Sequence, residues 1–292
     1  MHSVQFDGSF TGWREAARGL LQQGVAPHQV NWLGDGDTGG LFDHAPVSIS
    51  TQSEAPAPRI PKQLLELLQS AARFRIADRW SLLYRILWRV AQGDRAAMLA
   101  GDIDGSQLHK RLKAVRRETH HLHAFLRFHP RPENAEGPQL VAWHEPAHDI
   151  LRSASGHFAE RLGRSTWLIA TPDDGVYWDG QRLHHQRPCP SEWQRLAQNP
   201  EDDGAALWLA YYGSTFNPAR LNRSALQNNL PVRFWKNLPE GPLIPQLMSQ
   251  ARAGAQRNGQ AEAVARQGGK RIHCSATKKA ALNESVCPDP LR

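Results

Sequence analysis

Positive charge dominates one stretch of the sequence, residues 107–131. This stretch holds seven Lys or Arg residues and one acidic residue, Glu118, which gives it a net charge of +6. A surface that serves solubility alone usually mixes charges of both signs. The imbalance predicts contacts with phosphates, which we expect from Lys110, Lys113, Arg116, Arg117 and Arg127. The alternative is an ordinary solvated helix face.

Aromatic and polar side chains alternate in a second stretch, residues 208–240. Aromatic rings stack on unpaired bases while Arg and Lys hold phosphates, and proteins grip single strands or flipped nucleotides in this way. We expect nucleic-acid contacts here from Tyr212, Asn217, Arg220, Arg233, Trp235, Lys236 and Asn237. The alternative is that the aromatic residues of this stretch are core anchors, because large aromatics are mostly buried. That alternative applies to Trp208, Tyr211, Phe216 and Trp235.

Three carboxylates are candidates for acid–base catalysis: Glu118, Asp173 and Asp174. Asp174 precedes a glycine, however, as a turn residue often does. Four histidines close to Glu118 also suggest a metal site, namely His120, His121, His123 and His129. Their spacing matches neither HExxH nor a zinc-finger pattern, so we expect hydrogen-bonding or solvated histidines, no metal and no cofactor. No GxSxG, P-loop or dinucleotide-binding fingerprint is present, so the motifs name no reaction.

The basic stretch must sit on a helix, because Leu108, Leu112, Val115 and Leu122 recur at helical spacing. The alternating residues 125–129 that follow predict a short strand. Upstream, the sequence predicts a strand at VQF, a turn at residues 7–8 and a helix through Leu21. A loop over residues 34–59 and helices from Pro61 and Asp78 come next.

Downstream of residue 130 the pattern becomes that of short strands, at 139–143, 166–171, 176–178 and 181–185. Asp-Gly pairs at 174–175 and 179–180 predict hairpin turns, and a helix over 146–162 interrupts the series. Helices are expected again from residue 201. The fold class is therefore α+β, an antiparallel meander sheet flanked by helices, with helical N-terminal and C-terminal parts. We expect one domain over 1–255 and a basic, flexible tail over 256–292.

Composition narrows the class of protein. The 292 residues carry a net charge of +7, and residues 252–279 alone carry +6, so the remaining body is neutral to acidic and a polyanion partner is expected. The three cysteines have no CxxC spacing and form no disulfide framework, which indicates a reducing, cytoplasmic setting. No apolar run approaches the roughly 18–20 residues of a membrane span, so we expect no membrane association.

The chain resembles a bacterial DNA-metabolism (DNA-repair) family whose biochemical activity is unassigned. Eight motifs carry the resemblance: GWREAARGLL, LLYRILWRV, KAVRRETHHLHAFLRF, VAWHEPAHDIL, HFAERL, WLIATPDDGVYWDGQRL, YYGSTFNPARL and FWKNLPEGPLI. Members of this family occur beside a radical-SAM DNA-repair protein or fused ahead of a UdgX-type uracil-DNA glycosylase. The resemblance implies DNA as a partner and an association with one of those proteins. A fused glycosylase domain would begin near residue 270 and does not fit before Arg292, so we expect a free-standing member or a chain shortened before that domain.

The leading expectation is a DNA-binding accessory domain of bacterial DNA repair, acting with a uracil-DNA glycosylase or radical-SAM partner. One alternative is an enzyme that acts on a nucleobase or modified nucleotide, with Glu118 and Asp173 or Asp174 as acid and base. Another alternative is a protein–protein adaptor, which would need an exposed apolar patch.

Overall fold

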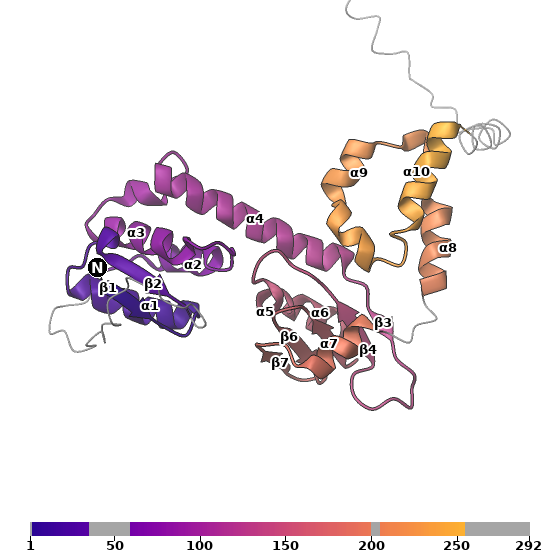
Figure 1. Cartoon of the computed structure of the whole chain (residues 1–292), viewed down its shortest axis with the longest axis horizontal. Coiled ribbons are helices and arrows are strands. Elements are labelled where there is room, and N and C mark those ends of the chain that lie inside the picture. Colours follow the sequence, from indigo (N-terminus) through magenta and orange to yellow (C-terminus); the bar gives the residue numbers. More distant parts are fainter. Residues whose placement is uncertain (1, 35–58, 200–204, 255–292) are drawn as a thin grey trace, which may run out of the picture.

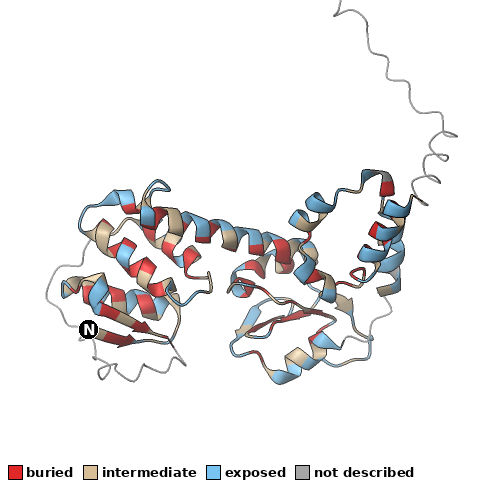
Figure 2. Ribbon diagram, turned by 45° about the horizontal axis from the view of Figure 1, so that its top comes forward, coloured by how far each residue is buried: buried red, intermediate tan, exposed pale blue. Residues whose placement is uncertain are grey.

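A long helix, α4 (Ile103–Phe125), joins two hydrophobic cores in the computed structural model, which describes residues 2–34, 59–199 and 205–254 (Figure 1). Leu108 and Leu112 pack into the N-terminal core, and Val115 and Leu122 pack into the second core. The predicted apolar stripe of this helix is therefore confirmed. Figure 2 shows the buried side of α4 against both cores and its exposed side facing away. The expected tail, and all but the ends of the expected loop 34–59, lie outside the described residues.

Local sequence explains where α4 begins. The carboxylate of Asp102 accepts the amide N–H groups of Asp104 and Gly105 at the helix N-terminus. Gly105 is required there, because a Cβ atom would lie 1.9 Å from the carbonyl oxygen of Leu99. The predicted strand over 125–129 is wrong, because the helix continues through Phe125, whose ring packs on the C-terminal hydrophobic cluster. Only His129–Pro130 pair as a strand, β3.

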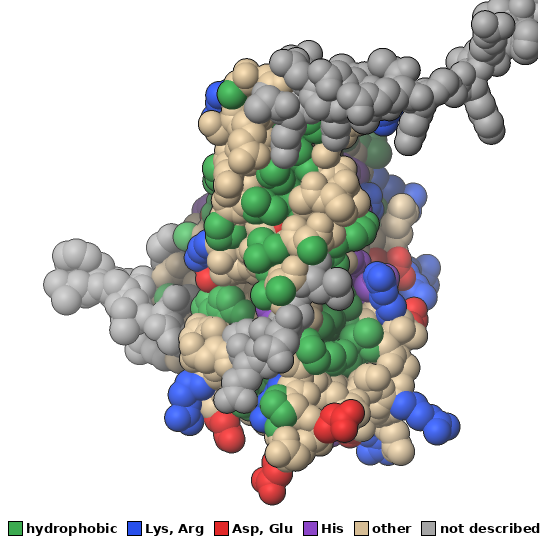
Figure 3. Space-filling view, turned by 90° about the vertical axis from the view of Figure 1, so that its right-hand side faces the viewer, with side chains coloured by type: hydrophobic (Ala, Val, Ile, Leu, Met, Phe, Trp, Pro, Cys, Tyr) green, Lys and Arg blue, Asp and Glu red, His purple; other side chains and the backbone are tan. Residues whose placement is uncertain are grey.

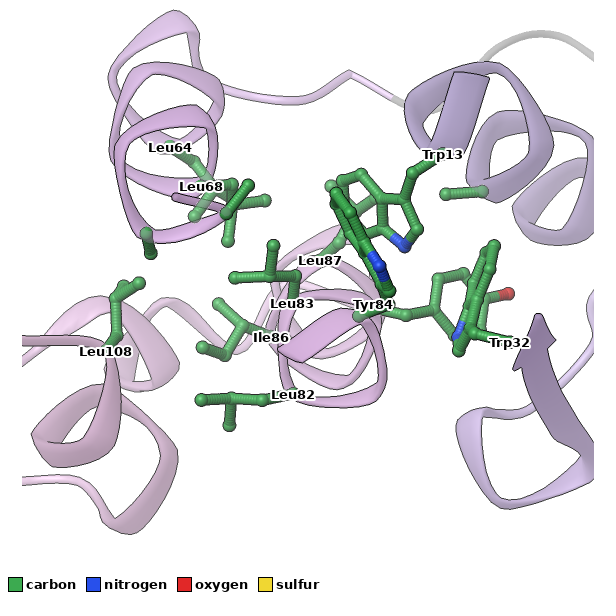
Figure 4. Packing of buried hydrophobic residues seen from close by; sticks show 14 of the residues in the cluster. Trp13, Trp32, Leu64, Leu68, Leu82, Leu83, Tyr84, Ile86, Leu87 and Leu108 are labelled. Atoms are coloured by element: carbon green, nitrogen blue, oxygen red, sulfur yellow. The ribbon is translucent and has the colours of Figure 1, made fainter. Parts of the chain in front are cut away.

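The N-terminal core lies between a small sheet and three helices. Strands β1 (His2–Gln5) and β2 (Val30–Leu33) are parallel, and α1 (Phe10–Gln22) connects them. Helices α2 (Lys62–Ala71) and α3 (Arg79–Ala91) complete the layer, with the 3-10 turns η1 (Pro27–Gln29) and η2 (Arg95–Met98). Trp13, Trp32 and Tyr84 gather there with the leucines of α3 (Figure 4). The sequence predicted the first strand and helix but not the parallel partner β2.

The second core covers a five-stranded sheet of order β3-β4-β5-β6-β7. The remaining strands are β4 (Leu140–Trp143), β5 (Trp167–Ala170), β6 (Gly175–Trp178) and β7 (Leu183–Gln186). The antiparallel meander β5–β6–β7 and its two turns confirm the predicted α+β class. Strands β4 and β5 are parallel, because α5 (Leu151–Ala154) and α6 (Gly156–Leu162) carry the chain back before β5 begins. The expected helix over 146–162 is therefore shorter, and residues 144–150 are irregular.

Helix α7 (Ser191–Gln198) packs on β4 and β5, and a helical C-terminal part follows it. This part contains α8 (Ala205–Thr215), η3 (Pro218–Arg220), α9 (Arg223–Asn229), η4 (Val232–Asn237) and α10 (Leu243–Ala253). Its small core, with Leu230, Leu238 and Ile244, meets the end of α4 through Phe125. Within the described residues, none of the helices combines the length and apolar character that crossing a membrane requires.

Candidate functional site

The exposed side of α4 carries the predicted phosphate contacts Lys110, Lys113, Arg116 and Arg117, which we call the basic face. These positions recur at spacings of three and four residues, so their side chains leave the same side of the helix. None of the four forms an ion pair with a described residue. By contrast, each of the following arginines pairs with a carboxylate: Arg75, Arg79, Arg85, Arg89, Arg111, Arg127 and Arg233.

The opposite side of α4 is polar as well, but buried. Arg111, Glu118 and His121 lie seven and ten residues apart, which places them on one side of the helix, and each is at most 6% exposed. Arg111 is neutralised by Asp78, with an Nη2–Oδ1 distance of 2.8 Å. Helix α4 therefore presents unpaired positive charge to solvent, and it presents the charged groups of Arg111 and Glu118 and the imidazole of His121 to the interior.

Glu118 is the centre of this interior set. Its Oε1 accepts the amide N–H of Ala147 at 2.8 Å, and its Oε2 accepts a hydrogen bond from Arg233. His121 Nδ1 lies 3.9 Å from the same Oε2. Three segments far apart in the chain thus meet at one carboxylate: α4, the loop after β4, and η4.

Two further histidines complete the set. His144 is 3% exposed and its ring stacks on Phe234, with centroids 5.4 Å apart. Burial lowers the pKa of His144 to about 4, and burial also lowers the pKa values of His121 and His148. All three imidazoles are therefore neutral at pH 7. We call Glu118, His121, His144, His148 and Arg233 the polar centre.

The position of the polar centre follows from the sheet. The loop with His144 and His148 leaves the carboxyl end of β4, and the turn with Asp173 and Asp174 leaves the carboxyl end of β5. Because β4 and β5 are parallel, both connections lie at the same edge of the sheet. The two connections therefore lie next to each other at the carboxyl ends of β4 and β5.

His144 and His148 were not among the predicted site residues, although residues 144–148 are HEPAH and match the HExxH pattern. In a metalloprotease this motif is helical, so both histidines lie on one face and bind one ion. Here the backbone is irregular and contains Pro146, and the rings diverge: His144 stacks on Phe234, and His148 on Phe74. Across residues 2–34, 59–199 and 205–254, no group of three or more His, Cys, Asp or Glu side chains is arranged to hold a metal ion.

The other two candidate carboxylates are engaged in structural contacts. Asp173 pairs with Arg75, with an Nη2–Oδ2 distance of 2.7 Å. Asp174 is buried, accepts the hydroxyl of Thr171 at 2.8 Å, and lies 2.9 Å from His185 Nε2. Asp174 therefore braces the turn between β5 and β6, and neither residue contacts Glu118 directly.

Three of the predicted nucleic-acid residues are held by carboxylates. Arg127 pairs with Glu240 at 2.7 Å, Lys236 pairs with Glu145 at 2.6 Å, and Arg233 pairs with Glu118. Asn237 also hydrogen-bonds Glu145. These contacts connect the segment around η4 to α4 and to the loop after β4.

The remaining predicted residues separate into two groups. Trp235 is half-buried, and its Nε1 donates to the carbonyl of Leu230 at 3.1 Å. Tyr212, Asn217 and Arg220 line one surface pocket of about 400 Å³ formed by α8, η3 and α9. These three residues therefore share one pocket, and they lie in a part of the sequence far from the basic face of α4.

Two aromatic residues of α8, Trp208 and Tyr211, are not the core anchors that the alternative interpretation expected. Trp208 is 37% exposed and Tyr211 is 58% exposed, so neither is a core residue. Figure 3 shows hydrophobic side chains gathered on the face that α8 and its neighbours form. Arg127 lies over the Trp208 ring at 4.5 Å. An exposed apolar face of this kind is the feature that the adaptor alternative requires.

Residues 77–240 match the profile of a family described as "Domain of unknown function (DUF4130)". The matched span covers more than half of the chain and contains α4, the five-stranded sheet and the whole polar centre. No curated protein and no solved structure matches the chain significantly. The chain belongs to the DUF4130 family.

Proposed function

We propose that the chain is a DNA-binding accessory domain of bacterial DNA repair or metabolism, and that the basic face of α4 holds the phosphates. The observation that carries the proposal is the contrast between two sets of cations. Lys110, Lys113, Arg116 and Arg117 have no carboxylate partner among the described residues, while Arg85, Arg89 and Arg127 each pair with one. Four uncompensated charges on one rigid helix attract a polyanion.

The dimensions suit a nucleic-acid backbone. At a rise of about 1.5 Å per residue, Lys110 and Arg117 are separated by roughly 10 Å along the helix axis. Successive nucleotides of one strand advance by about 3.4 Å along a duplex, so the face covers a few consecutive phosphates. Arg127, Arg233 and Lys236 would contribute only by giving up their carboxylate partners. The repair context, and a glycosylase or radical-SAM partner, rest on the motif resemblance.

Fluorescence anisotropy with single-stranded, duplex and uracil-containing oligonucleotides tests the proposal. With four phosphate contacts the logarithm of the affinity for a single strand falls by about 2.8 per tenfold increase in salt. Raising salt from 50 to 200 mM should then weaken binding roughly 50-fold. A Lys113→Glu/Arg116→Glu variant keeps about two contacts, and its affinity should fall only about 7-fold over the same range.

The matched control is Arg161→Glu/Arg164→Glu, which makes the same charge change at exposed positions in and just after α6. Its salt dependence should equal that of the unmodified chain. No measurable binding, binding that does not depend on salt, or equal losses in both variants would each refute a role for the basic face.

The second candidate is an enzyme that acts on a nucleobase or modified nucleotide. The specific observation in its favour is Glu118, a carboxylate 3% exposed beside neutral imidazoles. The expected signature is release or conversion of a base, detected by mass spectrometry and abolished in Glu118→Gln. Asp173→Asn should leave such an activity unchanged, because Asp173 pairs with Arg75 outside the polar centre.

A further inference from the structure

The polar centre is closed by a side chain that reaches it from the surface. The Arg233 side chain is 43% exposed, whereas the Glu118 side chain that it contacts is 4% exposed. The Arg233 guanidinium also covers the ring of Phe234, with Cζ 4.4 Å from the ring centroid. Arg233 therefore stands between solvent and a buried group made of Glu118, His121 and His144.

Within that group, hydrogen-bonding capacity is left unused. His121 Nδ1 and His144 Nε2 are buried and make no hydrogen bond within the described structure. Buried polar atoms normally have partners, and an exception calls for a physical explanation. His144 is 3% exposed and His121 is 5% exposed, and both are on elements that converge on Glu118. A bound molecule with matching polar groups would supply those partners.

The chemistry of these side chains restricts what that molecule can be. A neutral imidazole offers one donor and one acceptor, and a carboxylate accepts N–H groups. The Arg233 guanidinium covers the ring of Phe234, so movement of Arg233 would uncover a flat apolar surface of the kind that base-binding sites use. The matching ligand is planar and uncharged, with both N–H donors and acceptors on its edge. A nucleobase has these properties.

We propose that Glu118, His121 and His144 bind one unstacked nucleobase of a bound strand, and that Arg233 opens this site by exchanging Glu118 for a phosphate. This inference rests on the proposed function, because the basic face must bind the strand that supplies the nucleobase. Guanidinium groups bind phosphate and carboxylate with the same fork of donors, so this exchange preserves the hydrogen bonds of Arg233. The exposed part of Arg233 gives a phosphate access to it.

Histidine-ring NMR on the full chain, labelled with ¹⁵N-histidine, tests the site directly. His120 is exposed on α4 beside the basic face and reports phosphate binding, while His144 reports occupation of the polar centre. The probes are a single-stranded oligonucleotide, an abasic strand of equal length, and deoxynucleoside monophosphates. His120 should shift with both strands. His144 should shift with the intact strand and the monophosphates only.

Affinity provides a second readout. Stacking of one base contributes at least about 1 kcal/mol of binding free energy, so the abasic strand should bind at least about fivefold more weakly than the intact strand. This ratio should approach one in Glu118→Gln. Glu145→Gln is the matched control, because Glu145 pairs with Lys236 outside the site, and its ratio should be unchanged. Thermal melting of both variants should show cooperative unfolding, as expected of folded chains.

The outcomes separate the two proposals. If His120 shifts while His144 responds to none of the probes, the base site is wrong and nucleic-acid binding stands. If no strand shifts His120, the proposed function fails, and the monophosphates then decide: a shift of His144 supports the site and no shift overturns it. An intact-to-abasic ratio near one in the unmodified chain also overturns the inference.

Discussion

Replacing Arg127 by methionine should destabilise the C-terminal helical part, because Arg127 neutralises a buried carboxylate. Its Nη2 lies 2.7 Å from Glu240 Oε1, and the two side chains are 14% and 2% exposed. Methionine keeps most of the aliphatic length of arginine but leaves the charge of Glu240 without a partner. Arg127 therefore has a structural role in this chain.

The expected loss can be estimated from the geometry. Removing one partner of a buried ion pair typically costs about 3–5 kcal/mol, and the partial exposure of Arg127 favours the lower end of this range. Loss of the Arg127–Trp208 contact, at 4.5 Å, adds about 0.5–1 kcal/mol. The total, about 3–4 kcal/mol, is a large part of the 5–15 kcal/mol by which domains are usually stable.

Urea unfolding measures the total loss, and hydrogen exchange over residues 205–254 shows whether it is local. Arg127→Met/Glu240→Gln should recover most of the lost stability, because no charge then remains buried. Arg164→Met is the matched control, since Arg164 is exposed and has no carboxylate partner among the described residues. A loss of unfolding free energy below about 1 kcal/mol in Arg127→Met would refute the structural role of the Arg127–Glu240 ion pair. No recovery of stability in the double variant would also refute it.

Three further predictions follow from buried groups. Folding lowers the pKa of His144 from 6.5 to about 4, so on acidification His144 is protonated in the unfolded chain before it is protonated in the folded chain. Stability therefore falls as the pH decreases from about 6.5 to about 4. The loss due to His144 is about 3 kcal/mol, and urea midpoints of His144→Gln should be correspondingly less pH-dependent in that range. Gly105→Ala should lower stability by about 1–3 kcal/mol in thermal melts, because its Cβ would overlap the Leu99 carbonyl, whereas Gly156→Ala, whose Cβ has open space, should not. Trp13→Ala should cost about 3–5 kcal/mol because Trp13 is fully buried, and Trp208→Ala, at an exposed position, should cost far less by the same assay.

Local patterns were sufficient to predict part of the fold. Turns lie where the two Asp-Gly pairs predicted them, since β6 begins at Gly175 and ends just before Asp179. The leucines of α4 also pack as their spacing predicts. Patterns were insufficient where pairing is non-local. Strand β2 pairs with β1 across α1, and nothing within Val30–Leu33 specifies that partner. Residues 125–129 alternate like a strand, yet tertiary packing of Phe125 extends the helix.

The candidate site was only partly predictable for the same physical reason. Exposure of Lys113 and Arg116 follows from the helical periodicity of their own segment. The burial of Glu118 does not, because its neutralising partner Arg233 is 115 residues away in the sequence. A carboxylate in a basic stretch can be solvated or buried, and only the fold decides. The HEPAH motif is visible in the sequence, but the different directions of the His144 and His148 rings depend on the irregular backbone after β4.

Helix α4 connects the proposals physically. One side exposes Lys113 and Arg116, and the other side holds Glu118 and His121 within the same turns of the helix. A strand on the basic face would therefore lie within a helix diameter, about 10 Å, of the polar centre. Arg233 is the one group of the polar centre that is both substantially exposed and bonded to Glu118. In this proposal, phosphate binding outside and base binding inside are coupled through that single side chain.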